Sequence, residues 1–178
     1  QIGPTLPNRL YLWSGTSGWD YLTPTHTAST LPYNNPSLAG PPPVLTWPTM
    51  ADVLDDAGLP WKCYSVADGS VPSSIGAFNP LIFFKSILSN PQKLARATAD
   101  ISELFADLAT GTLPAVSWIV TEAVASEHPP APPDMGQLLA ARVVEELMAS
   151  SAWDSSVLFL TYDEGGGYFD HVPPAILE

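Results

Sequence analysis

The chain has 178 residues, of which 46% are hydrophobic. This length fits one domain, and this hydrophobic content is enough for a sizeable core, which excludes a disordered acidic tail. Six Lys and Arg against 18 Asp and Glu give a net charge of −12, which disfavours binding to nucleic acid. The single cysteine excludes an intrachain disulfide and a multi-cysteine zinc site. No apolar run in the sequence reaches the ~18 residues of a membrane-spanning helix.

Apolar spacing and turn residues predict helices that alternate with strands along the chain. We expect helices over residues 7–14, 50–57, 91–108 and 136–149, and strands over residues 61–66, 115–121 and 156–162. Thr49 and Asn90 are suitable N-caps, and Gly58 and Gly111 are suitable stops. This alternation predicts an α/β fold, a three-layer sandwich around a largely parallel sheet, in a single domain over residues 1–178.

Two loops at the expected strand ends contain most of the residues with chemical potential. Asp163 and Glu164 follow the last strand and precede three glycines, and His171 lies further along the same loop. His128 lies in the loop after the strand at 115–121. Ligands of parallel sheets bind beyond the carboxyl ends of the strands, so we expect both loops at one edge.

Each of these features has a structural alternative. Two adjacent carboxylates repel each other unless a proton or a cation lies between them, so Asp163 and Glu164 are candidate ligands of a divalent metal ion. The other interpretation is a glycine-rich turn with solvated charges. His128 is either a catalytic group or a structural loop residue. His26 has no candidate partner, and we expect it to be structural.

Thr5 lies just before the helix expected from Pro7. The free N–H groups at a helix start favour an anion, and Asn8 and Arg9 are able to donate hydrogen bonds to phosphate oxygens. The alternative is that Thr5 merely begins a helix. Trp13, Trp19, Tyr21 and Tyr33 either pack in the core or line a cation-binding site.

Four motifs occur together in a fixed order. They are Gly-Pro-Thr-x-Pro-Asn-Arg at residues 3–9, Leu-Pro-x-Val-Ser-Trp-Ile-Val at 113–120, Ser-Glu-His-Pro at 126–129 and Tyr-Asp-Glu-x-x-Gly-x-Phe-Asp-His-Val-Pro-Pro at 162–174. In these motifs the chain resembles the phosphoesterase family of bacterial phospholipases C, acid phosphatases and plant non-specific phospholipases C. That family is part of the alkaline-phosphatase-like superfamily, whose fold is therefore expected here.

The resemblance implies a role for each matching residue. Thr5 would be the nucleophile that takes and releases the phosphoryl group, and Asp163 and Glu164 would hold one divalent ion against the Thr5 oxygen. His128 and His171 would bind phosphoryl oxygens or move protons as catalytic groups. Asn8 and Arg9 would accompany the nucleophile in substrate binding. Two carboxylates do not select among divalent ions, so the identity of the metal stays open.

The resemblance also implies that the sequence is the central part of a longer catalytic domain. The family has a metal-binding Glu-Asn motif upstream and a further Asp-His element downstream, and neither is present in these 178 residues. It further suggests an exported protein, periplasmic or extracellular. The sequence contains no signal for an oligomeric state.

Several functions are compatible with these residues. A phosphoric ester hydrolase of the phospholipase C type, acting on a phospholipid or another phosphate ester, is the first expectation. An acid phosphatase and a non-catalytic binding module with the same fold are the alternatives. Sulfatases of the superfamily use a Cys or Ser nucleophile in a different motif, which residues 3–9 match poorly, and Cys63 lies elsewhere.

Overall fold

The elements of the computed structural model alternate between helices and parallel strands. The structure describes residues 5–17, 44–65, 78–121, 123–165 and 172. Its α-helices (α), 3₁₀ helices (η) and strands (β) are, in chain order, α1 (Thr5–Ser14), α3 (Met50–Asp56), β1 (Trp61–Ser65), η1 (Pro80–Phe83), α5 (Lys85–Leu88), α6 (Pro91–Ala97), β2 (Ala99–Asp100), α7 (Ile101–Thr110), β3 (Val116–Val120), η2 (Ala123–Ala125), α8 (Pro133–Ala149) and η3 (Trp153–Ser155). None of the helices in these residues is long and apolar enough to span a membrane.

The sheet within these residues has three parallel strands in the order β2-β1-β3. In the register, Trp61 lies opposite Val116, and Ser65 lies opposite Val120. Parallel neighbours need a crossover connection, and helices provide the crossovers here. Because all three strands share one direction, their carboxyl ends lie at one edge of the sheet.

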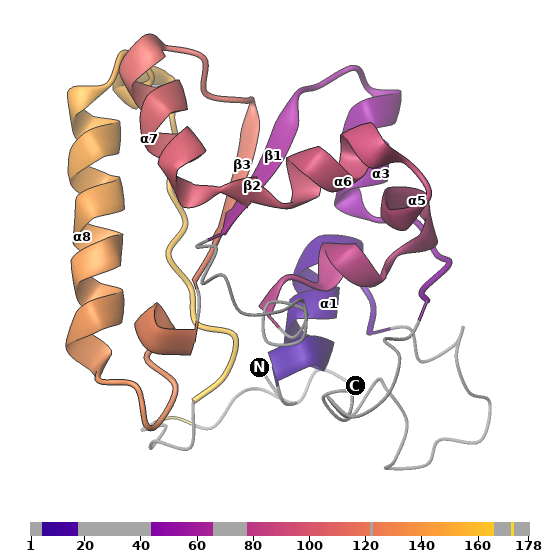
Figure 1. The fold of residues 1–178 in the computed structure, drawn as a ribbon, viewed down its shortest axis with the longest axis horizontal. Coiled ribbons are helices and arrows are strands. Elements are labelled where there is room, and N and C mark those ends of the chain that lie inside the picture. Colours follow the sequence, from indigo (N-terminus) through magenta and orange to yellow (C-terminus); the bar gives the residue numbers. More distant parts are fainter. Residues whose placement is uncertain (1–4, 18–43, 66–77, 122, 166–171, 173–178) are drawn as a thin grey trace.

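Helices cover both faces of this sheet (Figure 1). On one face, Trp61 and Cys63 of β1 pack with buried residues of α1, α3 and α6. On the other face, Tyr64 packs with Leu104 of α7 and Val143 of α8. Successive residues of a strand point to opposite faces, so β1 contributes to two separate cores. The prediction of an α/β sandwich with a parallel sheet is confirmed.

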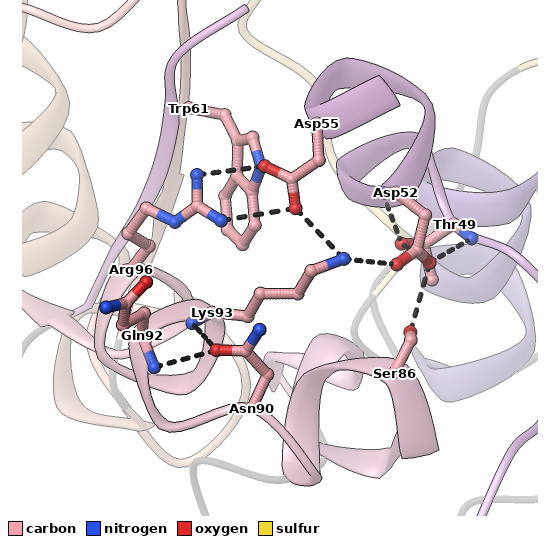
Figure 2. A network of polar contacts seen from close by, with 9 residues as sticks. All are labelled: Thr49, Asp52, Asp55, Trp61, Ser86, Asn90, Gln92, Lys93 and Arg96. Carbon is pink, nitrogen blue, oxygen red and sulfur yellow. Dashed lines mark hydrogen bonds and ion pairs between the residues drawn. The ribbon is translucent and has the colours of Figure 1, made fainter. Parts of the chain in front are cut away.

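A polar network fixes helices α3 and α6 over β1 (Figure 2). Lys93 Nζ lies 3.0 Å from Asp52 Oδ1 and 2.9 Å from Asp55 Oδ2. Asp55 also accepts a hydrogen bond of 2.9 Å from the Trp61 indole. The guanidinium of Arg96 pairs with Asp55 and lies over the Trp61 ring, 4.4 Å from its centroid. These contacts join two helices and a strand through groups that are mostly shielded from solvent.

Most of the predicted elements are confirmed to within about three residues, which is the usual uncertainty of element ends. Thr49 caps α3 through a capping box with Asp52, as its hydroxyl suggested. The Asn90 side chain caps α6 by accepting hydrogen bonds from the backbone N–H groups of Gln92 and Lys93. Trp13 belongs to the core, while the predictions for His26, Trp19, Tyr21 and Tyr33 lie outside the described residues.

The prediction of one helix over residues 91–108 is wrong. The chain leaves helix α6 at Thr98, forms the short strand β2 and begins α7 at Ile101. Asp100 starts the second helix with a capping box to Glu103. Apolar residues on both helices keep a three- and four-residue spacing across the break, and this spacing made the two helices resemble one.

The prediction of a strand over residues 156–162 is also wrong. These residues have no regular secondary structure, and Val157, Phe159 and Leu160 are 78%, 86% and 72% exposed. Their β-branched and aromatic composition suits a strand, but a strand forms only when a neighbour supplies hydrogen-bond partners. Among the described residues, β2, β1 and β3 are the strands of the sheet, and none of them pairs with this segment.

Candidate functional site

Helix α1 lies toward the end of the sheet at which β1 and β3 finish (Figure 1). Its apolar residues Leu6, Leu10 and Trp13 are buried in the core, which anchors the helix against α3 and η1. Thr5, the first residue of the helix, is only 5% exposed. A burial of this kind fixes the position of the hydroxyl relative to its surroundings.

Thr5 meets the acidic pair that follows residue 162. Thr5 Oγ1 donates a hydrogen bond of 3.3 Å to Glu164 Oε1, across a separation of 159 residues in the sequence. The Thr5 hydroxyl and the Glu164 carboxylate, from opposite ends of the sequence, are in direct contact. The structure therefore brings together two of the predicted site residues, Thr5 and Glu164.

Asn8 and Arg9, on the same helix, contact the other member of the pair. Asn8 Nδ2 donates a hydrogen bond of 2.7 Å to the backbone carbonyl of Asp163. Arg9 Nε donates one of 2.7 Å to Asp163 Oδ2, an ion pair whose side chains are 14% and 23% exposed. The role of these two residues in substrate binding stays a prediction.

His128 lies outside this cluster in the part of the chain that the structure describes. Its ring is exposed, and its hydrogen bonds go to its own loop, with Nδ1 2.7 Å from the carbonyl oxygen of Pro129. The preceding residue, Glu127, accepts a hydrogen bond of 3.0 Å from the Tyr162 hydroxyl. This bond, and to a smaller extent burial, raises the pKa of Tyr162. The loop of His128 is therefore joined to the residue before Asp163, and His171 lies outside the described residues.

Cys63 is not a candidate nucleophile. It is fully buried in β1, and this burial raises the pKa of its thiol to about 12, while the positive charge of Arg9 opposes the rise. A thiol with such a pKa stays protonated near neutral pH, and the thiolate is the reactive form of cysteine. This agrees with the expectation that the sulfatase type of site is absent from residue 63.

The oxygen atoms around Thr5 suit a hard divalent cation. The Thr5 hydroxyl contacts the Glu164 carboxylate, the carboxylate of the adjacent Asp163 pairs with Arg9, and hydroxyl and carboxylate oxygens are ligands that Mg²⁺, Ca²⁺ and Mn²⁺ accept. No group of three or more His, Cys, Asp or Glu side chains within the described ranges is arranged to hold a metal ion. The oxygen atoms of Thr5, Asp163 and Glu164 are of the type that a hard divalent ion accepts, and their role as metal ligands stays a prediction.

Three further residues shape this region and were missed in the sequence. Glu127 precedes His128, and Tyr162 precedes Asp163, so both lie inside motifs that the sequence analysis quoted. That position was the sequence signal by which they could have been identified. Phe78 accepts a hydrogen bond from Arg9 Nη1 through its carbonyl oxygen, and the Arg9 guanidinium lies 5.2 Å from the centroid of its ring. Nothing local in the sequence identifies Phe78, because its role depends on a contact with a residue 69 positions away.

Together, these features define an α/β protein with a buried hydroxyl set against a pair of carboxylates near the carboxyl ends of parallel strands. The model of the Phosphoesterase family matches residues 1–178, the whole sequence, and the chain belongs to this family.

Named relatives of the chain include bacterial and plant proteins. The chain is 32% identical to phospholipase C B of Mycobacterium tuberculosis over 97% of its own length and 33% of that protein. It is 34% identical to the non-hemolytic phospholipase C of Pseudomonas aeruginosa, with 97% and 25% covered. It is 26% identical to non-specific phospholipase C6 of Arabidopsis thaliana, with 96% and 29% covered. The chain thus spans a quarter to a third of the length of these relatives.

Proposed function

We propose that this chain forms part of a phosphoric ester hydrolase of the phospholipase C type, with Thr5 as the nucleophile. The observation that supports the proposal is the hydrogen bond of 3.3 Å from Thr5 Oγ1 to Glu164 Oε1. Membership of the Phosphoesterase family and similarity to proteins named phospholipase C favour this reaction class. The proposed substrate is a phospholipid, cleaved at the bond between its phosphorus atom and the diacylglycerol oxygen.

The proposed reaction has two displacement steps. Thr5 Oγ1 attacks the phosphorus atom, the bond to the alcohol oxygen breaks, and the phosphorylated head group stays on Thr5. The hydroxyl of Thr5 is oriented toward Glu164 Oε1, which is an acceptor for the proton released by the attack. The leaving oxygen takes up a proton, for which His128 and His171 are the predicted donors. Water then displaces Thr5 from phosphorus, which releases the phosphorylated head group and restores the hydroxyl.

Burial of Thr5 supports a role as nucleophile. Its side chain is held at the start of a helix whose apolar face lies in the core, so the oxygen has little freedom to move. A fixed nucleophile removes part of the entropic barrier of a reaction between two molecules. A divalent ion bound by Asp163, Glu164 and Thr5 would supply positive charge to the reacting oxygen and to the phosphoryl group.

Substitution of Thr5 tests the nucleophile. Thr5→Val keeps the shape of the side chain and removes the oxygen, so we expect phosphatidylcholine hydrolysis by the purified protein to fall at least about a thousandfold. Thr5→Ser keeps the oxygen and should retain measurable activity. Acid quenching during turnover, followed by mass spectrometry, should detect a phosphoryl adduct on residue 5 in the wild type and not in Thr5→Val.

Thr110→Val is the matched control, because Thr110 is exposed on α7 and its hydrogen bonds to described residues go to Ala106 and Thr112, close by in the sequence. It should leave hydrolysis unchanged. Comparing a phosphodiester with p-nitrophenyl phosphate separates the phospholipase type from the acid phosphatase. Full activity in Thr5→Val would contradict the proposed nucleophile, and an absence of hydrolysis in the wild type with any divalent ion would favour the binding module.

A further inference from the structure

We propose that Asn8 and Arg9 are positioning residues, which hold Asp163 against helix α1 and thereby keep Glu164 facing Thr5. This inference rests on the proposed function, because it explains how the nucleophile and the acidic pair are held together. In this inference, the main role of Asn8 and Arg9 is to position Asp163, and not to contact the substrate.

The two residues hold one partner through two different groups. Asn8 Nδ2 donates to the backbone carbonyl of Asp163, and Arg9 Nε donates to its carboxylate, each at 2.7 Å. A bond to the backbone fixes the path of the chain, and a bond to the side chain fixes the direction of the carboxylate. Together they restrain both the position and the orientation of Asp163, to which Glu164 is directly attached.

The spacing along α1 explains why these bonds act on the same place as Thr5. Residues three and four positions apart lie on one face of a helix. Thr5, Asn8 and Arg9 have this spacing and lie within α1, Thr5–Ser14. One helical face therefore presents a hydroxyl to Glu164 and two donors to Asp163, and the rigid helix fixes the distances between them.

Arg9 is itself held from a third segment. Its Nη1 donates to the carbonyl oxygen of Phe78 at 2.5 Å, and its guanidinium lies over the Phe78 ring. The planar guanidinium with its fixed donors suits such simultaneous contacts, which a lysine ammonium does not reproduce. Arg9 therefore connects α1, the chain before η1 and the acidic pair in a single set of bonds.

The charge of Arg9 also favours a positioning role. Its ion pair with Asp163 is largely shielded, with exposed side-chain fractions of 14% and 23%. A guanidinium paired with a carboxylate offers little net positive charge to a phosphoryl group. The same pairing reduces the repulsion between the adjacent carboxylates of Asp163 and Glu164, which would otherwise separate them.

The test compares Arg9→Gln, Arg9→Lys and Asn8→Ala in the purified protein. The first readout is hydrogen–deuterium exchange of the peptide covering residues 158–165, measured without substrate. We expect exchange in this peptide to become about tenfold faster in Arg9→Gln, because its anchor is lost. The second readout is hydrolysis of a soluble phosphodiester, in which kcat should fall about tenfold or more while KM stays within about threefold.

The other two variants are smaller perturbations that test the same inference. Arg9→Lys keeps the charge and should restore part of kcat, and Asn8→Ala should change exchange and kcat in the same direction but less. Asn8→Ala removes the neutral hydrogen bond to the Asp163 carbonyl and leaves the Arg9–Asp163 ion pair in place, so it provides the result if Arg9→Gln does not fold. Arg142→Gln is the matched control, since Arg142 is 60% exposed and pairs with Glu146 on α8; it should change neither readout.

Two outcomes would overturn the positioning role. One is an increase of KM by tenfold or more with kcat and exchange unchanged, which is the result of a direct substrate contact. The other is exchange identical to that of wild type in both Arg9→Gln and Asn8→Ala. Exchange is measured without turnover, so it decides this inference even if the Thr5 variants refute the proposed function.

Discussion

At the scale of single residues, Lys93 shows how this acidic chain stabilises its carboxylates. Its ammonium lies 3.0 Å from Asp52 and 2.9 Å from Asp55, two carboxylates that are three positions apart on helix α3. The side chains of the three residues are 20%, 17% and 21% exposed, so solvent replaces these contacts poorly. Removing the cation leaves two partly buried carboxylates near each other.

Lys93→Met should lower the free energy of unfolding by about 1–3 kcal/mol, because the methionine keeps most of the side-chain packing and loses both ion pairs. Urea denaturation followed by circular dichroism measures this difference. Lys85→Met is the matched control on the adjacent helix α5, since Lys85 is exposed, and it should change stability by less than about 0.5 kcal/mol. Equal effects of the two substitutions would show that the network does not stabilise the fold.

At the scale of elements, helix α8 depends on a glycine in its first turns. Gly136 is buried, and a Cβ atom placed on it would lie 2.9 Å from the carbonyl oxygen of Ala125 and would overlap the Glu127 side chain. Glu127 itself has a φ of 62°, a left-handed conformation that non-glycine residues seldom adopt. The absence of a side chain at residue 136 therefore allows the loop of His128 to approach the helix.

Gly136→Ala should lower the free energy of unfolding by about 1–2 kcal/mol, because the added methyl group meets backbone as well as side-chain atoms. Glycine to alanine in a helix ordinarily stabilises by about 1 kcal/mol, so the expected sign is reversed. Thermal or urea unfolding gives the value. Ala141→Gly, at an exposed position of the same helix, measures the difference in helix propensity between alanine and glycine without the close contact. A stabilised Gly136→Ala protein would show that the close approach has no energetic consequence.

The elements also show where local sequence signals succeed. Thr49 with Asp52, and Asn90 with Pro91, identify helix starts because an N-cap is satisfied by groups within the same turn. Asp100 and Glu103 form the same signature inside the region predicted as one helix. This capping box was the signal that would have divided the helix, and the regular apolar spacing outweighed it.

At the scale of the whole molecule, ion pairs between helices and the sheet make stability depend on pH at both extremes. Burial alone would raise the pKa of Asp52, Asp55 and Asp107, but hydrogen bonds from Lys93, Lys62 and neighbouring groups outweigh it and lower all three. Burial alone would lower the pKa of Lys62 and Lys93, and their carboxylate partners raise both.

The sign of each effect follows from linkage. The carboxylates stabilise the fold above their unfolded pKa of about 3.9, and this contribution is lost as the pH falls through the lower folded values. The lysines stabilise it below about 10.4, and this contribution is lost as the pH rises through the higher folded values. We therefore expect Tm to be nearly constant between about pH 5 and 9, and to fall beyond both limits.

Thermal unfolding between pH 3 and 11 measures this profile. Asp55→Asn should lower Tm at neutral pH. It should also make the fall of Tm at acidic pH less steep, because one of the carboxylates with a lowered pKa is removed. Asp56→Asn, at the exposed neighbouring position, is the control and should leave the profile unchanged. A Tm that falls equally for Asp55→Asn and wild type below pH 4 would contradict the assignment of acid sensitivity to these pairs.

The sequence by itself determined the N-caps of α3 and α6, the strands β1 and β3, the α/β class and, through four ordered motifs, the family. These features depend on neighbours within a few residues or on the motifs themselves. Tertiary structure decided the rest. Residues 156–162 have the composition of a strand, yet strand formation needs a partner from elsewhere, and β2 exists because Ala99 and Asp100 pair with β1. The contact of Thr5 with Glu164 and the contacts of Asn8 and Arg9 with Asp163 join segments more than 150 residues apart. The packing of α1 against the core and the contacts of its polar face set these distances, because no local preference acts over such a separation.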